Sequence, residues 1–349
     1  MMNDRILRAL RCENYNSPPP IWVMRQAGRY MPEYMALRKR HSLLELFHSP
    51  ELAADVTMLP IDAFAPDAAI LFSDILVIVE ALGLGLEFKE KQGPVIERPI
   101  NSEKDIHHLP RIDLEESLAF VYETIKLLKP RLDVPLLGFS GAPFTLASYM
   151  IEGGSSRDLA KTRKLAYNSP LVLHQLLDTL TEHVIQHLRL QIKAGVNAVQ
   201  IFDSWANHLS PSLFKTFIAP YLERIVKALK DSGTPVIIFC RGTSAFVDQL
   251  TELKPSAISI DWSCDIADFR ARCPEGIAIQ GNMDPYVLSA SHECIKKEVH
   301  RLIDAMHGHP GYIFNLGHGI TPDIPYENMR YLINTVKELR EELAAETVN

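Results

Sequence analysis

Eight short apolar runs recur along this chain, and segments with the 3.6-residue periodicity of amphipathic helices separate most of them. The runs span residues 21–25, 68–75, 134–140, 198–204, 236–240, 257–261, 277–281 and 312–316. Most are continuously apolar, which is typical of parallel strands buried on both faces. Eight strands that alternate with helices predict an α/β fold of the (β/α)8 TIM-barrel type. The alternative is a doubly wound open sheet, which needs no closure.

We interpret residues 1–349 as a single domain, because the length fits one α/β barrel and no repeat or linker interrupts the pattern. Residues 1–19 form a short lead-in to the barrel, with a helical pattern over 1–14. The long segment 83–110 contains a Gly-Pro and an Arg-Pro pair. These pairs favour turns, so we expect a surface insertion within the domain.

The charge and the cysteines exclude several classes of function. The formal net charge is −7, whereas general nucleic-acid or anionic-membrane binding needs a basic surface. The longest near-apolar run, 75–86, contains Glu80 and is too short to span a bilayer. The N-terminus has no apolar core of signal-peptide length. The five cysteines suggest neither a disulfide framework nor a CxxC metal motif, so we expect a cytoplasmic protein with reduced thiols.

Two arginines stand four residues apart just after the first apolar run, in the sequence Arg25-Gln26-Ala27-Gly28-Arg29. A guanidinium stays charged and presents a planar fork that matches a carboxylate. Since the carboxyl ends of barrel strands face the active site, this pair is a candidate anion clamp. We expect Gly28 to let the backbone bend there and Pro32 to open a helix. The alternative is a surface turn with two solvated arginines.

Polar residues also follow the other apolar runs. Asp74 and Ser204 stand at strand ends, Tyr149 lies in the helix after the third run, and His318 stands between two glycines. Each has an ordinary structural alternative: a helix cap for Asp74, a half-buried core position for Tyr149 and a solvated side chain for His318. Their shared position at one end of a barrel favours a site that holds a polar ligand.

Two long blocks and three shorter ones resemble the uroporphyrinogen decarboxylase family. The long blocks are residues 21–34 (IWVMRQAGRYMPEY) and 138–146 (GFSGAPFTL). The shorter blocks are 72–75 (FSDI), 202–204 (FDS) and 315–319 (NLGHG). They cover nearly the whole chain in the family's order, so chance agreement is excluded.

The resemblance implies an enzyme that converts the four acetate side chains of uroporphyrinogen III into methyl groups, giving coproporphyrinogen III and four CO₂ in haem biosynthesis. It implies catalytic roles for Asp74 and Arg25, with Asp74 accepting pyrrole N–H groups and stabilising positive charge on a pyrrole. Arg25 is a poor proton donor, because the pKa of an arginine lies above ~12, so a substrate carboxyl or a water stays open as the donor. The implied substrate-binding residues are Arg25, Gln26, Ala27, Gly28, Arg29, Asp74, Tyr149, Ser204 and His318. The family further implies no metal or organic cofactor, and a homodimer with its barrel mouths facing each other.

Two other functions stay open. Corrinoid-dependent methyltransferases of the same superfamily bind zinc through a His-x-Cys motif near the fifth strand, but this chain has Phe239-Cys240-Arg241 with no histidine two residues before the cysteine. A non-catalytic tetrapyrrole-binding protein would have no need of Asp74, Arg25 and Arg29 together.

Overall fold

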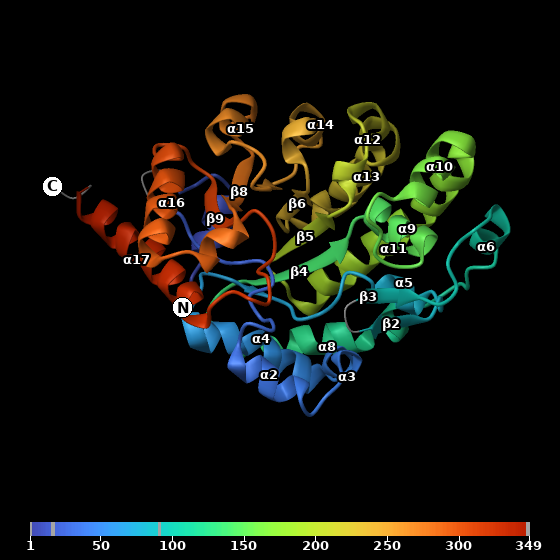
Figure 1. Ribbon diagram of the computed structural model, residues 1–349, viewed down its shortest axis with the longest axis horizontal. Helices are drawn as coiled ribbons and strands as arrows, with labels where there is room; N and C mark the ends of the chain where they lie inside the picture. The colour runs from blue at the N-terminus through green and yellow to red at the C-terminus, as the bar shows by residue number, and fades with distance from the viewer. Residues whose placement is uncertain (1, 15–17, 90–91, 347–349) are drawn as a thin grey trace.

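A single parallel sheet forms the centre of the computed structural model, which describes residues 2–14, 18–89 and 92–346 (Figure 1). Its strands follow one another in the order β1-β4-β5-β6-β7-β8-β9, and each pairs in parallel with the next. They are β1 (Ala69–Ile70), β4 (Leu136–Gly141), β5 (Ala198–Asp203), β6 (Val236–Cys240), β7 (Ala257–Ile260), β8 (Ala278–Met283) and β9 (Tyr312–Leu316). The sheet curls into a TIM-barrel-like ring, which confirms the predicted fold class.

The first apolar run, 21–25, is not a regular strand, so the prediction of eight strands was wrong by one. Its backbone nevertheless lies between β9 and β1: Ile21 bridges Phe314 in parallel, and Asp67 N–H donates to the Ile21 carbonyl over 2.7 Å. Pro20 has no N–H to donate to a ladder. The Ile21 N–H instead bonds the Asp67 carboxylate at 2.9 Å, and the Met24 N–H bonds the Asn315 side chain at 3.2 Å. Side chains thus replace the regular ladder where the ring closes.

Helices cover the outside of the ring (Figure 1). In chain order the α-helices are α1 (Arg5–Leu10), α2 (Pro32–Arg38), α3 (Leu43–His48), α4 (Pro50–Phe64), α5 (Val77–Ala81), α6 (Glu103–His107), α7 (Leu114–Ser117), α8 (Ala119–Leu128), α9 (Pro143–Glu152), α10 (Ala160–Asn168), α11 (Pro170–Ala194), α12 (Pro211–Phe217), α13 (Ala219–Leu229), α14 (Val247–Glu252), α15 (Ile266–Arg272), α16 (His292–Ala305) and α17 (Tyr326–Glu346). The short 3₁₀ helices are η1 (Ala206–His208), η2 (Lys230–Ser232), η3 (Thr243–Ala245) and η4 (Pro285–Ser289).

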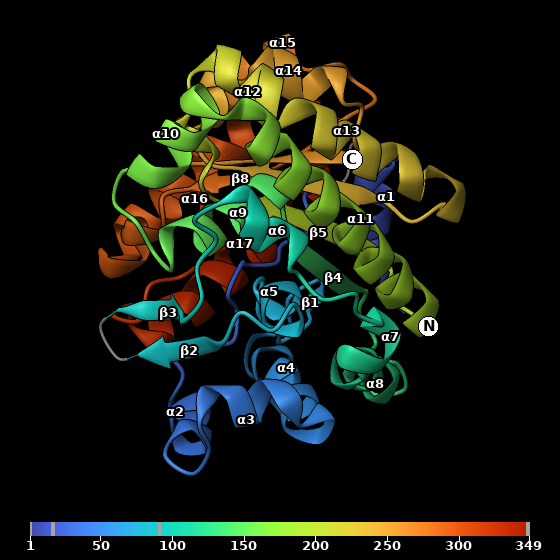
Figure 2. The ribbon, with the colours of Figure 1, turned by 90° about the vertical axis from the view of Figure 1, so that its right-hand side faces the viewer.

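Local sequence signals set several helix boundaries. Pro32 occupies the first turn of α2, as predicted, because its fixed φ suits that position. Ser291 caps α16 by accepting a hydrogen bond from the Cys294 N–H. The expected insertion 83–110 contains the antiparallel hairpin of β2 (Leu86–Lys89) and β3 (Gly93–Ile96), which lies outside the main sheet (Figure 2). No helix in the described part of the chain is long and apolar enough to cross a membrane.

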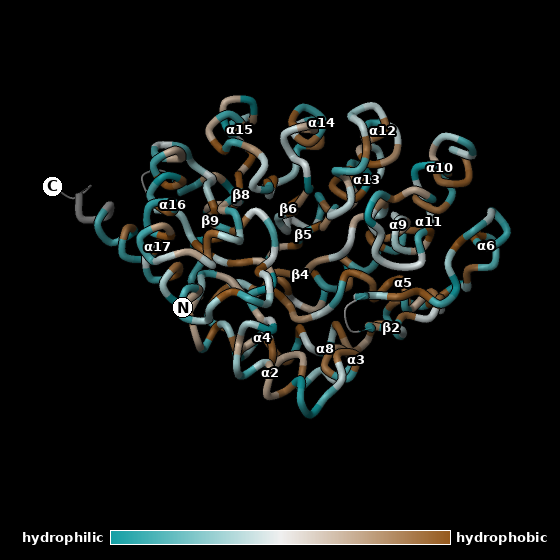
Figure 3. Tube along the Cα trace, in the orientation of Figure 1, coloured by the Kyte–Doolittle hydropathy of each residue, from teal (hydrophilic) through white to brown (hydrophobic). Residues whose placement is uncertain are grey.

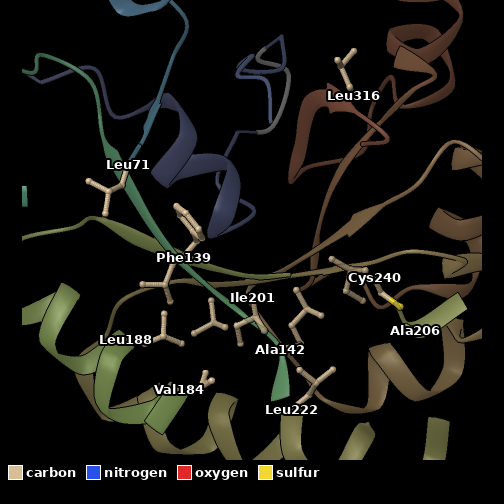
Figure 4. Packing of buried hydrophobic residues seen from close by; sticks show 14 of the residues in the cluster. Leu71, Phe139, Ala142, Val184, Leu188, Ile201, Ala206, Leu222, Cys240 and Leu316 are labelled. Carbon is tan, nitrogen blue, oxygen red and sulfur yellow. The ribbon is translucent and has the colours of Figure 1, made fainter. Parts of the chain in front are cut away.

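The main hydrophobic core fills the space between the strands and the outer helices. Val184 and Leu188 of α11 and Leu222 of α13 belong to one buried cluster with Ile201 of β5 and Cys240 of β6 (Figure 4). The strands are correspondingly hydrophobic along their length, while the outer helices carry hydrophilic residues on their exposed turns (Figure 3). This layer holds the strands in place, so that their carboxyl ends can carry polar groups.

A second buried cluster closes the amino-terminal end of the ring. Ile6, Ala9 and Leu10 of α1 pack against inward-facing residues from the starts of the strands, such as Leu137 and Ile313. The lead-in therefore acts as a plug for the barrel, and the opening must lie at the other end.

A polar layer lies inside the barrel, above this plug. Gln280 accepts a hydrogen bond from the Trp22 indole and donates to Gln200 and to Ser259, each over 2.9 Å. All four side chains are buried. Burying an amide is costly unless it is hydrogen-bonded, so the completeness of this network stabilises four segments of the ring relative to one another.

Candidate active site

A cavity opens at the carboxyl ends of the strands. Its wall is formed by Met24, Arg25, Gln26, Ala27, Ile70, Leu71, Phe72, Ser73, Asp74, Ile75, Phe139, Phe202, Ser204, Phe239, His318 and Gly319. These residues come from the segment before α2, from β1, β4, β5 and β6, and from the loops that follow β1, β5 and β9. This is the end at which active sites of TIM barrels lie.

Arg25 takes the sharp turn at the end of the first apolar run. Its φ is +59°, a left-handed conformation that is uncommon for a residue with a Cβ. Gly28 lies in a bend, as predicted, but it has no positive φ and does not line the cavity. The bend at Arg25 directs its exposed side chain across Gly319 at the edge of the cavity.

Asp74 both accepts a local hydrogen bond near the start of α5 and lines the cavity, so the two interpretations given for it from the sequence hold together. Its Oδ1 accepts a 2.8 Å hydrogen bond from the Leu76 N–H, a local turn that leads into α5, and the carboxyl group also lines the cavity. Burial raises the pKa of Asp74 to about 6, while the Leu76 hydrogen bond and the charge of Arg25 oppose that rise. At neutral pH the cavity therefore contains a carboxylate that is poorly solvated and faces a nearby cation.

His318 lines the cavity close to Phe239 and Trp262, with ring centroids 5.9 and 6.1 Å away. Burial, and then the charges of Arg25 and Arg241, lower the pKa of His318 to about 4. The imidazole is therefore neutral at neutral pH, with one nitrogen that donates and one that accepts. Of the two flanking glycines, Gly319 lines the cavity and makes room for Arg25, and Gly317 lies against the backbone at Asp261 and Trp262.

The other expected site residues divide into two groups. Gln26, Ala27 and Ser204 line the cavity, and the buried Gln26 amide has no hydrogen-bond partner among the described residues. Arg29 is exposed and lies outside the wall.

Tyr149 is half-buried behind the wall, with its ring against Trp205 at 5.6 Å. Burial, followed by the charge of Asp74, raises the pKa of Tyr149.

The floor of the cavity is aromatic. The ring centroids of Phe139 and Phe202 are 5.7 Å apart, and those of Phe202 and Phe239 are also 5.7 Å apart. Phe139 and Phe202 lie in the blocks that resemble the family, whereas Phe239 is one apolar residue among several in its strand. The one sequence signal for Phe239 is the alternation of side chains along a strand, which places Phe239 on the same face as Ile237, inside the barrel.

One buried acid behind the wall was not expected. Asp203, at the end of β5, is fully buried; its Oδ1 accepts from the Thr145 hydroxyl at 2.7 Å, and its Oδ2 has no partner among the described residues. Burial raises the pKa of Asp203 to about 7, which the Thr145 hydrogen bond opposes. The Thr145 hydroxyl also accepts from the Trp205 N–H, so the pair supports the turn that carries Ser204.

Comparison with solved structures shows the fold. A methyltransferase from Methanosarcina mazei superimposes with a TM-score of 0.82 at 22% sequence identity, covering 97% of this chain and 98% of that one. A B12-independent methionine synthase from Shewanella sp. W3-18-1 gives a TM-score of 0.55 at 12% identity, covering 96% and 97%. At these identities the likeness concerns the architecture alone.

Comparison of sequences is more specific. The family model described as uroporphyrinogen decarboxylase (URO-D) matches residues 1–339. A uroporphyrinogen decarboxylase from Protochlamydia amoebophila is 52% identical over 338 residues, which cover 97% of this chain and 92% of the relative. One from Geobacillus kaustophilus is 46% identical over 340 residues and covers 97% of each chain. This chain belongs to the uroporphyrinogen decarboxylase family.

Proposed function

We propose that the protein decarboxylates the four acetate side chains of uroporphyrinogen III to methyl groups, releasing coproporphyrinogen III and four CO₂. The observation that carries this proposal is that Asp74 and Arg25 both line an aromatic-floored cavity, in a chain of this family. The aromatic floor offers an apolar surface to a macrocycle, and the charged groups face its polar substituents.

The chemistry needs an electron sink, which the pyrrole ring can provide. Protonation of a ring carbon gives a cation that accepts the electrons of the breaking C–C bond as CO₂ leaves. The exocyclic enamine that results is then protonated to a methyl group, and the ring carbon loses the proton it first accepted, so that the pyrrole is restored and each CO₂ released consumes one proton net. The site must hold the carboxylates, stabilise the cation and allow protons to reach the substrate.

Asp74 suits the stabilisation of the cation. Its pKa of about 6 leaves it ionised at neutral pH, and a fixed charge in a poorly solvated cavity acts strongly on charge that develops beside it. The oxygen that does not bond Leu76 is available to accept pyrrole N–H groups. Burial and, to a smaller extent, the charge of Glu80 raise this pKa, whereas the Leu76 N–H and the charge of Arg25 favour the anion.

The remaining residues bind and orient the substrate. Arg25 and Arg29 can each bind a carboxylate bidentately; Arg25 lines the cavity, and Arg29 is exposed outside its wall. Gln26, Ser204, Tyr149 and neutral His318 supply uncharged donors and acceptors.

The alternative of a zinc-thiol methyltransferase is not supported by the cysteine of β6. Cys240 is fully buried, and burial, followed by the charges of Asp203 and Asp261, raises its pKa well above the ordinary value. A zinc ligand must be a thiolate, which this environment disfavours. Among the described residues, no three His, Cys, Asp or Glu side chains lie together in a way that could hold a metal ion.

We also infer that the chain is one domain that functions as a homodimer in the cytoplasm. Membership of the family supports this inference. Two large exposed side chains, Trp262 after β7 and Tyr286 in η4 after β8, stand at the end of the barrel where the two mouths would meet. Light scattering of the purified protein tests the pairing.

The deciding experiment is anaerobic incubation of the purified protein with uroporphyrinogen III, followed by oxidation and chromatography of the porphyrins. We expect products with progressively fewer carboxylates that end at coproporphyrin III. The boiled protein is the control for spontaneous loss of CO₂. Unchanged uroporphyrin with folded protein would overturn the proposed function.

A further inference from the structure

A further arginine, Arg241, stands at the same end of the barrel as Arg25, outside the sequence blocks that carry the family resemblance. Arg241 directly follows β6, and its guanidinium carbon lies 5.7 Å from the centre of the Trp262 ring. Arg241 is partly buried, and Trp262 is 38% exposed. A guanidinium held over an indole face keeps its planar fork in one orientation while its N–H groups stay available.

This arginine acts on a residue of the cavity wall. The charges of Arg25 and Arg241 both lower the pKa of His318, and Trp262 contacts the His318 ring at 6.1 Å. Arg25 belongs to the segment before α2, and Arg241 follows the end of β6, so the two cations come from different parts of the barrel.

The nearby acids do not neutralise Arg241. Within the described ranges, no carboxylate oxygen lies within 4.0 Å of its guanidinium. Asp261, at the end of the neighbouring strand, accepts instead from the Gly242 N–H and from the Ser263 hydroxyl at 2.7 Å. Asp203 bonds the Thr145 hydroxyl through its Oδ1. Arg241 is therefore a partly buried guanidinium at the carboxyl end of the strands, without a carboxylate partner in the described part of the chain.

We propose that Arg241, oriented by Trp262, forms a second carboxylate-binding site on the β6–β7 side of the mouth and grips a side-chain carboxylate of the tetrapyrrole. This inference rests on the proposed function, because it takes its ligand from there. In this arrangement Arg25 and Arg29 bind carboxylates on one side of the barrel mouth, and Arg241 binds a carboxylate on another side of it.

The charge of the whole protein explains why a second site matters. The chain carries a net charge of −7, while uroporphyrinogen carries eight carboxylates, so the overall field opposes binding. Local cations on two sides of the mouth offset that repulsion and also fix the orientation of the macrocycle. The aromatic support of Trp262 lowers the loss of side-chain freedom when the guanidinium binds.

The test compares Arg241→Gln, Arg241→Lys and Trp262→Leu with a matched surface control, Arg272→Gln. Arg272 is an exposed arginine of α15 whose guanidinium already pairs with a carboxylate, that of Asp248. Steady-state kinetics with uroporphyrinogen III at two ionic strengths should show KM raised about tenfold in Arg241→Gln, the effect of one lost charge-assisted hydrogen bond. Arg241→Lys and Trp262→Leu should fall between this variant and wild type, and kcat should change much less than KM. The salt dependence of kcat/KM should be shallower in Arg241→Gln.

A second readout needs no turnover. Removing the Arg241 charge removes a repulsion felt by protonated His318, so its pKa, followed by NMR titration, should rise in Arg241→Gln and stay in place in Arg272→Gln. If a folded Arg241→Gln protein keeps the KM and the salt dependence of the unchanged protein, this inference is overturned. The proposed function still stands in that case, provided that the unchanged protein forms coproporphyrinogen III. Wild-type protein that forms no coproporphyrinogen would overturn the proposed function and, with it, the ligand assigned to Arg241.

Discussion

The side chain of Arg25 lies directly over the Cα of Gly319. A Cβ placed on Gly319 would approach Arg25 Cγ to 2.6 Å and Arg25 Nε to 2.9 Å, closer than real side chains allow. The left-handed backbone of Arg25 and the missing side chain of residue 319 therefore act together, because the first directs the guanidinium across the mouth and the second leaves it room. Two segments almost 300 residues apart in the chain position one cation.

Gly319→Ala should reduce activity without unfolding the protein. The added methyl group pushes the Arg25 stem out of its place, and we expect kcat/KM to fall about tenfold, as for one lost charge-assisted hydrogen bond. Gly276→Ala is the matched control, because nothing lies within 4 Å of a Cβ there. Equal kcat/KM in both variants and wild type would show that the position of Arg25 does not matter.

Asp74→Asn should keep the fold and lose most turnover. The amide retains one acceptor oxygen for the Leu76 N–H but no longer carries the charge that stabilises a developing cation. Loss of one such electrostatic group costs ~10²-fold or more in rate. Single-turnover rates measure the effect, and circular dichroism checks the fold. Near-normal turnover in a folded variant would contradict the assigned role.

The activity should fall as the pH drops through about 6. The pKa of Asp74 in the folded protein is about 6, raised from an ordinary value of 3.8, so the carboxylate is present above that pH and is lost below it. A profile of kcat/KM between pH 5 and pH 8 should show this acidic limb. The residual activity of Asp74→Asn should lack the limb; if the limb persists there, another group causes it.

Arg25 and Arg29 should differ in their kinetic effects. Arg25 lines the cavity, so Arg25→Ala should lower kcat as well as kcat/KM, since only interactions strengthened in the transition state raise kcat. Arg29 is exposed outside the wall, so Arg29→Ala should mainly raise KM, by about tenfold and more at low salt. Lysine at either position should lower kcat/KM less than alanine does, because it keeps the charge. It should not restore the wild-type value, because it loses the planar fork. The measurement is steady-state kinetics at two ionic strengths. Wild-type kcat/KM in both folded alanine variants would remove the arginines from the binding site.

Local patterns in the sequence were enough to predict seven of the strands and the end of the barrel at which the polar residues gather. Continuous apolar runs such as 236–240 report burial on both faces, and residues that follow them, such as Asp74 and His318, must lie at the carboxyl end of a strand. The blocks shared with the family added the candidate site residues.

Only the tertiary structure decided how the ring closes and which cations face the cavity. The run 21–25 forms only an isolated bridge to β9, and the side chains of Asp67 and Asn315, distant in sequence, accept from its Ile21 and Met24 N–H groups. The turn at Arg25 depends on space left by Gly319, and Arg241 lies beside Trp262 of the loop after β7. Hydrophobic periodicity reports whether a residue is buried. Contacts between distant side chains depend on the closed ring, and no local pattern contains them.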